Sequence, residues 1–462
     1  MRHADVLIVG AGMGGLVTAN RAQERGLSTL LLEADQRPGG SMRFSGGLVW
    51  TANDLEVARQ VAPQGDENLQ RVLVDGIESL WSYLQHCNVP LLEAENVFDI
   101  GRGRQFGLGA PGFRDEVATT LLRRFVARGG DFIGASRVRS LDFEPDVGQF
   151  IAGVHHAWQG PSSVGGERLV LASGGFHADK ELVERHIVRP HRNLVQRGNA
   201  HSRGDGLVFG LGLGGLETTR MDTFYGHSLA SPIDYRSPHR WIDCAQYYTD
   251  RCVLVAWDGR RFVDESAGVV EETVAQAGAR LPDGRYAAIF DDDLYREHVV
   301  SQGNLPGSVG RHDAFSLARD LGASTACEDT LDKLCARLTE WGIDGARAAE
   351  TVADFNAWVR DGARPGELSP ERRRWARAVV TAPFRAVALV PAITFTTGGL
   401  AVDDRFRLRQ QTATDTNDGG LRGDVRVVGA DAGGVFGHNY AGGLAWAGVG
   451  AMRAIDDITS AG

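Results

Sequence analysis

The glycine motif near the N-terminus limits what this chain can fold into more than any other segment. Its parts follow one another as a strand at Asp5–Val9, the motif glycines Gly10, Gly12 and Gly15, a helix at 16–25 and a second strand at 28–32 that ends at Glu33. A short apolar run, a G-x-G-x-x-G turn, a helix, a strand and an acid in this order predict a βαβ unit of a parallel sheet.

Each motif residue has a physical reason for its place. Gly10 permits the tight turn, Gly12 lets the backbone approach a pyrophosphate, and Gly15 lets the helix pack closely on the strand. The helix N-terminus then offers unpaired N–H groups to the phosphates, and Glu33 can accept hydrogen bonds from ribose hydroxyls. Gly14, in the same turn, is predicted to be a further cofactor contact.

The loop after Glu33 distinguishes FAD from NAD. It contains two more glycine pairs, which a nicotinamide site does not need, and here the sequence resembles the flavoprotein of the fumarate reductase and succinate dehydrogenase superfamily. In that family the loop runs along the flavin. The resemblance therefore implies FAD contacts at Ala34, Gly39, Gly40, Ser41, Ser45, Gly46 and Gly47.

The resemblance recurs along almost the whole chain. Four further segments are similar to the family's later cofactor motifs, and the contacts that they imply are Ala172, Ser173 and Gly174 in a returning strand, Gly204 and Asp205 in a G-D-G turn, Asp431 on the ribityl chain, and Gly443 and Leu444. The last two open a small-residue helix at 444–452, whose N-terminus would point at the flavin N1–C2=O edge.

The predicted fold is therefore α/β, a Rossmann-type, doubly wound FAD-binding domain with an inserted α+β substrate or cap domain. The motifs stop between 222 and 382, so we expect the FAD domain to comprise 1–221 and 383–462, with the cap between them. Apolar spacing also predicts helices at 66–86 and 114–128.

The chain departs from the respiratory members of the family near Gly40. Those members attach FAD covalently to a histidine a few residues before the double glycine, and this segment has no histidine. We therefore expect non-covalent FAD.

The segments that match the family's substrate-binding motifs also differ from the family pattern. The segment 259–265 resembles the family's G-x-R-F-V-x-E, but the arginine acid expected near Val269 is missing. Tyr440 replaces the late motif arginine, and 394–399 carries threonines where the family has a histidine. Two substrate carboxylates need cationic clamps, so fumarate and succinate are disfavoured.

The string at 437–442 is closer to the 3-ketosteroid 1-dehydrogenases and the tricarballylate dehydrogenase-like branch. In the steroid enzymes the matching tyrosine hydrogen-bonds the substrate ketone, which makes Tyr440 the predicted oxyanion donor. Tyr225 and His227 open the cap and are the predicted proton-transfer or pocket-lining groups. Tyr247 and Tyr248 are further candidates, His438 is expected to be structural or flavin-facing, and Glu265 is expected to form a salt bridge with Arg261.

The composition and charge limit the kinds of partner that this protein is expected to bind. The net charge of −10 argues against nucleic acid, and no apolar run is long enough to span a membrane. Five scattered cysteines fit free thiols in a reducing cytoplasm, with no metal centre expected. The Arg-rich stretch 371–375 is interpreted as the solvated face of a helix.

Three functions remain open at this point. The first is a flavin dehydrogenase or ene-reductase acting α,β to the carbonyl of a steroid-like or other cyclic small molecule, with an electron donor or acceptor that the sequence does not identify. The second is a tricarballylate- or fumarate-type polycarboxylate dehydrogenase or reductase. The third is a flavin-binding electron-transfer subunit.

Overall fold

The computed structural model describes residues 2–107, 113–189, 193–238, 240–269, 271–300, 313–410 and 423–460. It divides into two compact units. Unit 1 comprises Met1–Ile187, Gly198–Phe224 and Phe395–Gly462, and unit 2 comprises Val188–Arg197 and Tyr225–Thr394.

Unit 1 is built on a seven-stranded sheet in the order β6-β2-β1-β9-β8-β7, with β16 also paired to β9. Its strands are β1 (Arg2–Val9), β2 (Thr29–Leu32), β6 (Asp131–Ile133), β7 (Ser136–Glu144), β8 (Gln149–His156), β9 (Gly160–Leu171) and β16 (Asp424–Val427). The pairs β6–β2, β2–β1, β1–β9 and β9–β16 are parallel. The predicted βαβ unit is therefore confirmed, with β2 beside β1.

The other elements of unit 1 surround this sheet. A three-stranded sheet contains β3 (Leu48–Ala52), β5 (Gly101–Phe106) and β4 (Leu91–Val97) in that order. The helices are α1 (Met13–Glu24), α2 (Leu55–Val61), α3 (Glu67–His86), α4 (Phe113–Ala127), α5 (Lys180–His186), α6 (Asp205–Gly212) and α13 (Gly443–Ser460), with the short turns η1 (Gly40–Phe44) and η5 (Gly429–Asp431). The expected helices at 66–86 and 114–128 match α3 and α4, while α1 begins three residues earlier than expected.

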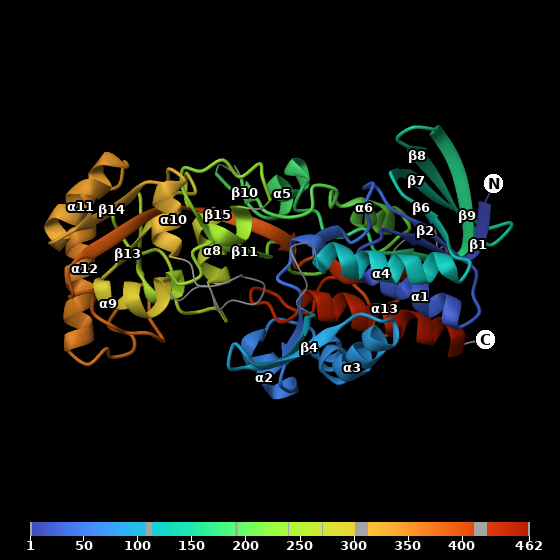
Figure 1. Cartoon of the computed structure of the whole chain (residues 1–462), viewed down its shortest axis with the longest axis horizontal. Coiled ribbons are helices and arrows are strands. Elements are labelled where there is room, and N and C mark those ends of the chain that lie inside the picture. The colour runs from blue at the N-terminus through green and yellow to red at the C-terminus, as the bar shows by residue number, and fades with distance from the viewer. Residues whose placement is uncertain are drawn as a thin grey trace. The chain divides into compact units, whose positions relative to one another are not determined.

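The C-terminal helix α13 is a central packing element of unit 1. It packs against both α1 and α3, and Figure 1 shows α1 lying between α4 and α13. Small residues make the close approach possible: a Cβ added at Gly448 would overlap Leu80, and one at Gly450 would overlap Phe406. The helix extends to Ser460, eight residues past its expected end at 452, because its buried face continues to Ile458.

Unit 2 is built on a six-stranded sheet in the order β10-β15-β13-β12, with β11 and β14 also paired to β15. Its strands are β10 (Val195–Gln196), β11 (Phe224–Ala230), β12 (Val253–Ala256), β13 (Tyr286–Phe290), β14 (Thr325–Glu328) and β15 (Phe384–Thr396). The remaining elements are α7 (Arg240–Asp243), η2 (Thr249–Arg251), α8 (Glu272–Ala279), α9 (Asp292–Leu294), η3 (Tyr295–Val299), α10 (Ala314–Asp320), α11 (Leu331–Glu340) and α12 (Gly345–Arg360).

Alternation along these strands gives unit 2 two cores. Leu254 packs with Val274 and Phe315 in one cluster, whereas Val253 packs with Leu334 in the other. Successive side chains of a strand point to opposite faces, so each face of the sheet is covered by its own helices.

The boundaries of unit 2 differ from the expected cap at 222–382. It ends at Thr394, because β15 is the strand with which β10, β11, β13 and β14 all pair. It also includes Val188–Arg197, because β10 pairs with the end of β15.

The interpretation of 371–375 as a solvated helix face is correct for the exposure of residues 373–375 and wrong in two other respects. This segment is not helical, and Arg372 is fully buried, with its Nη1 3.0 Å from Glu265 Oε2. Arg261 Nη2 lies 2.6 Å from the same Glu265 oxygen, which confirms the expected salt bridge. A buried carboxylate requires charge compensation, and a charge count along the sequence does not show which arginine provides it.

We predict that Arg372→Met lowers the free energy of unfolding by about 3–5 kcal/mol, because it removes one of two cations from a buried carboxylate. Arg373→Ala is the control, since the Arg373 side chain is 65% exposed and should contribute less than about 1 kcal/mol. Urea unfolding of both variants measures the difference. Equal losses in the two variants would contradict the prediction.

Candidate functional site

The G-x-G-x-x-G turn has the geometry that its sequence predicts. Gly10 has φ +104°, and a Cβ there would overlap the Ala172 carbonyl. A Cβ at Gly15 would overlap the Gly10 carbonyl, so helix and strand are in direct backbone contact. By contrast, a Cβ at Gly12 would meet no atom within 4 Å. The turn is thus closed on its protein side and open at Gly12, where the dinucleotide is expected. Gly14 faces inward, toward Val428.

Glu33 stabilises this turn from the end of β2. Its Oε2 accepts the Ala11 N–H at 2.7 Å, and its Oε1 accepts the Asp35 N–H at 2.7 Å. The side chain is buried, and burial raises its pKa. Each carboxylate oxygen has a second lone pair, so the two bonds are compatible with the expected ribose contact.

The loop after Glu33 returns to the same turn. The Gly39 N–H donates to the Ala11 carbonyl at 2.7 Å, and Gly40 lies against the Gly12 backbone. The structure therefore brings the second glycine pair to the open side of the first motif. Ala34 and Ser41 lie in this loop. Ser45 Oγ accepts the Gly47 N–H at 3.1 Å, and the Gly46 carbonyl accepts from Gln105 at 2.6 Å.

Ser173 joins three motifs that are far apart in the sequence. Its N–H donates to Asp431 Oδ2 at 2.5 Å, and its Oγ accepts the Gly206 N–H at 2.8 Å. The Gly174 N–H also donates to Asp431 Oδ2, at 3.2 Å. In the neighbouring turn the Gly204 N–H donates to the Gly175 carbonyl, and Asp205 pairs with Arg137 at 2.8 Å. The motifs at 172–174, 204–206 and 429–434 thus form one cluster.

Asp431 is fully enclosed in this cluster, and burial raises its pKa to about 7 despite the three donors from Ser173 and Gly174. In the described structure its carboxylate is engaged by protein groups. The expected contact with a ribityl chain stays a prediction.

Tyr440 lies at the N-terminus of α13. Its hydroxyl oxygen accepts the Gly443 N–H at 2.8 Å, and Gly443 and the partly exposed Leu444 begin the helix. Three aromatic rings surround the phenol ring in edge-on or tilted contacts: Trp50 at 5.9 Å, Phe395 at 5.5 Å and Phe436 at 5.4 Å between centroids. The predicted oxyanion donor therefore lies in an apolar setting at the positive end of a helix dipole.

Tyr225 and His227 lie in unit 2, two residues apart on β11 and so on one face of that strand. Their rings meet edge-on with centroids 4.8 Å apart, and Tyr247 contacts His227 in the same way at 4.9 Å. His227 Nδ1 lies 2.5 Å from Glu271 Oε1, and both side chains are buried.

Sequence reasoning missed several polar partners. Glu271 lies 44 residues from His227. Arg197 donates to the Tyr247 hydroxyl at 2.9 Å, and Arg220 lies 2.6 Å from His438 Nε2. No local pattern indicates these pairs, because only the fold brings them together.

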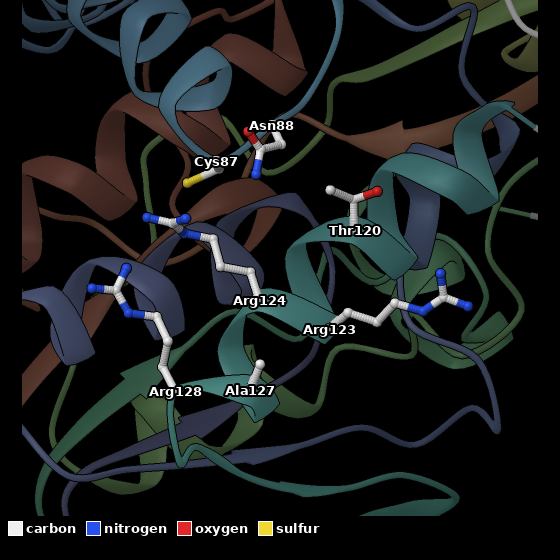
Figure 2. Close-up of a pocket in the computed structure, with 7 residues that line it drawn as sticks. All are labelled: Cys87, Asn88, Thr120, Arg123, Arg124, Ala127 and Arg128. Atoms are coloured by element: carbon white, nitrogen blue, oxygen red, sulfur yellow. The ribbon is translucent and has the colours of Figure 1, made fainter.

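A surface pocket in unit 1 lies away from the expected site. Figure 2 shows its lining from the end of α3 and from α4: Cys87, Asn88, Thr120, Arg123, Arg124, Ala127 and Arg128. Arg124 and Arg128 both pair with Glu24, and Arg123 extends away from Cys87 in Figure 2. None of the predicted site residues lines it.

Two further observations concern the described ranges. They contain no group of three or more histidine, cysteine, aspartate or glutamate side chains that could hold a metal ion. Among their helices, none combines the length and apolar character needed to cross a membrane.

Comparisons with known proteins agree with this geometry. A family model described as an FAD binding domain matches residues 5–445. A probable fumarate reductase of Shewanella frigidimarina is 25% identical over 96% of this chain and 72% of its own length. A 3-oxosteroid 1-dehydrogenase of Mycobacterium tuberculosis is 38% identical, but only over 17% of this chain and 14% of its own length.

Solved structures show the same fold. The 3-ketosteroid Δ1-dehydrogenase of Sterolibacterium denitrificans has a TM-score of 0.73 at 17% identity, with both chains fully covered. The 3-ketosteroid Δ4-(5α)-dehydrogenase of Rhodococcus jostii has a TM-score of 0.71 at 18% identity, covering 99% of this chain and 97% of its own. A flavocytochrome c3 fumarate reductase has a TM-score of 0.68 at 22% identity, covering 99% and 78%.

The residues present fit FAD. The first turn is open at Gly12, the 39–40 loop lies beside it, and Glu33 lies at the end of β2. We predict that Gly12→Ala weakens FAD binding at least about tenfold, because its methyl group would occupy the space that the pyrophosphate needs.

Gly212→Ala is the matched control, since that Cβ also meets no atom within 4 Å but lies at the end of α6. Titration of flavin-depleted protein with FAD, followed by flavin fluorescence, gives both affinities. An unchanged affinity in Gly12→Ala would contradict the assignment of this turn.

Proposed function

This chain belongs to the FAD binding domain family and is an FAD-dependent oxidoreductase of the kind that acts on CH–CH groups; we propose that its substrate bond lies α,β to the carbonyl of a steroid-like or other cyclic ketone. FAD, when bound, supplies the hydride acceptor or donor at its N5. The direction, dehydrogenation or ene reduction, depends on the electron partner.

The observation that carries this proposal is the setting of Tyr440. Its oxygen accepts a hydrogen bond from the first residue of α13, which polarises the phenol O–H. A polarised donor at a helix N-terminus suits a ketone oxygen that gains negative charge as the adjacent carbon loses a proton. The surrounding Trp50, Phe395 and Phe436 favour an apolar substrate body.

Other residues take supporting roles in the proposal. The FAD contacts are those of the glycine turn, the 39–47 loop, the Ser173 cluster and the start of α13. His227 or Tyr225 in unit 2 moves the proton at the substrate carbon. Tyr440 orients the carbonyl, and no other group of this chain is assigned to that oxygen.

A polycarboxylate substrate is the alternative, and the Shewanella relative supports it. Such a substrate needs cationic clamps. Arg220, Arg261, Arg372 and Arg385 are each held by a carboxylate, whereas Arg197 donates to neutral oxygens of Tyr247, Thr394 and Trp241. Among the described residues, Arg197 is thus the one arginine of these five without a carboxylate partner, and a polycarboxylate needs more than one such cation, so the ketone remains the first choice.

We further propose that FAD is held without a covalent bond, because no histidine lies in the segment before Gly40. Acid precipitation should leave the yellow flavin in the supernatant, measured by its absorbance. Flavin that stays with the precipitated protein would contradict this.

The buried free thiols at Cys87, Cys244, Cys252 and Cys335 favour a reducing compartment such as the cytoplasm.

Anaerobic mixing tests the proposed substrate class. A saturated cyclic 3-ketone should bleach the bound flavin within the dead time of manual mixing, or the corresponding enone should reoxidise the dithionite-reduced protein. Succinate and fumarate should do neither. The reverse pattern would favour the polycarboxylate alternative. Inertness toward both, with a stable stoichiometric protein partner, would favour an electron-transfer subunit.

In the same assay Tyr440→Phe should lower kcat about 10²–10³-fold, the usual cost of losing one oxyanion donor, with FAD retained. Tyr83→Phe, which removes a buried phenol hydroxyl on α3, is the control and should change kcat less than about twofold. Equal rates in the two variants would remove Tyr440 from the proposal.

A further inference from the structure

The strongest unassigned feature of the molecule is a buried acid–imidazole pair in unit 2. His227 lies on β11, and Glu271 is the residue immediately before α8. Nδ1 and Oε1 are 2.5 Å apart, His227 is 3% exposed and Glu271 is fully buried. At this distance the two groups form a hydrogen bond, so one of them donates a proton to the other.

The second carboxylate oxygen distinguishes this pair from a structural ion pair. Glu271 Oε2 is buried and has no hydrogen-bond partner in the described part of the chain. Glu265, the structural counterpart in the same unit, accepts from Arg261, Arg372 and the Leu254 N–H. A buried carboxylate with an unpaired oxygen is costly as an ion, and burial raises the Glu271 pKa to about 8 although Arg197 lowers it. The pair therefore holds one further proton below about pH 8, and its Nε2 can accept a proton only after that proton has left.

Two partly exposed phenols are among the side chains around the pair. Tyr225 and Tyr247 contact its ring edge-on, and Arg197 donates to the Tyr247 hydroxyl. The titratable and charged groups that face the pair are Arg197, Tyr225, Tyr247, Asp250 and Tyr286. In the part of the chain that the structure describes, Arg197 is the only cation among them, and its guanidinium donates to Tyr247, Thr394 and Trp241.

We propose that His227, and not Tyr225, is the proton-transfer group and that Glu271 is its positioning residue: Glu271 holds the proton on Nδ1 and thereby makes Nε2 the nitrogen that exchanges a proton with the substrate. A carboxylate on one ring nitrogen fixes the tautomer and raises the basicity of the other. The inference rests on the proposed function for the identity of the substrate carbon.

The chemistry balances in the dehydrogenation direction. The carbon next to the carbonyl would lose its proton to His227 Nε2, and FAD, when bound, would supply the acceptor for the hydride, with both electrons, of the neighbouring carbon. The carbon–carbon single bond becomes a double bond. In ene reduction the same proton and hydride return.

Histidine NMR of the FAD-bound protein tests the pair without any substrate. With ¹⁵N-labelled histidine, and His227→Gln to assign the signal, wild-type protein should show a far-downfield, exchange-protected Nδ1 proton. Glu271→Gln should remove that signal and lower the pKa of His227 by at least about one unit, since an opposite charge is lost. Identical His227 signals and titrations in the two proteins would overturn the proposal.

Steady-state kinetics with the cyclic ketone as substrate test whether Glu271 positions His227. Glu271→Gln should lower kcat about 10–100-fold and move the acidic limb of kcat/KM to lower pH, with KM changed less than about threefold. Asp292→Asn is the control: it breaks the buried pair with Arg385 in the same unit and should reduce stability without moving that limb.

The outcomes separate the two proposals. If wild-type protein acts on no ketone, the proposed function fails, and the NMR comparison still decides whether Glu271 controls His227. If wild-type protein turns over a ketone and Glu271→Gln keeps its pH profile, the positioning role is wrong even where the NMR signal changes.

Discussion

Direct backbone contact at the first turn is the constraint on which unit 1 depends. Because Gly15 has no side chain, the first turn of α1 rests on the Gly10 carbonyl, and because Gly10 has none, β9 can lie against β1 with Ala172 at the turn. These two contacts set the direction of α1. That direction in turn leaves Gly12 open and brings the 39–40 loop beside it. The flavin dinucleotide site therefore depends on three glycines, Gly10, Gly12 and Gly15, at which a side chain would close the site or push the backbone segments apart.

Four buried carboxylates hold other segments of the structure in place, and each has a different set of hydrogen-bond partners. Glu33 accepts two backbone N–H groups and holds the turn, whereas Asp431 gathers Ser173 and Gly174 and joins distant motifs. Glu265 is neutralised by two arginines. Glu271 has an imidazole and one oxygen without a partner. Of these four carboxylates only Glu271 has an oxygen without a hydrogen-bond partner among the described residues, and together with its imidazole partner this points to proton chemistry.

Local features of the sequence predicted a large part of this arrangement. Glycine spacing and apolar periodicity depend on neighbours within a few residues, so the βαβ unit, α3 and α4 were all found, as was the i,i+4 pair of Arg261 and Glu265. Pairs of residues that lie far apart in the sequence were not predicted. Arg372 reaches Glu265 across more than 100 residues, and Glu271 reaches His227 across 44. The extent of β15 depends on pairing with four other strands, which periodicity does not encode.

The close packing of α13 has a consequence for comparison among relatives. Gly448 faces Leu80 and Gly450 faces Phe406, each without room for a methyl group. In homologous chains a larger residue at either glycine therefore requires a smaller one at its facing position. Positions 80 and 448, and positions 406 and 450, should covary as compensating volume pairs, which would fix the alignment of the C-terminal helix where identity is too low to do so.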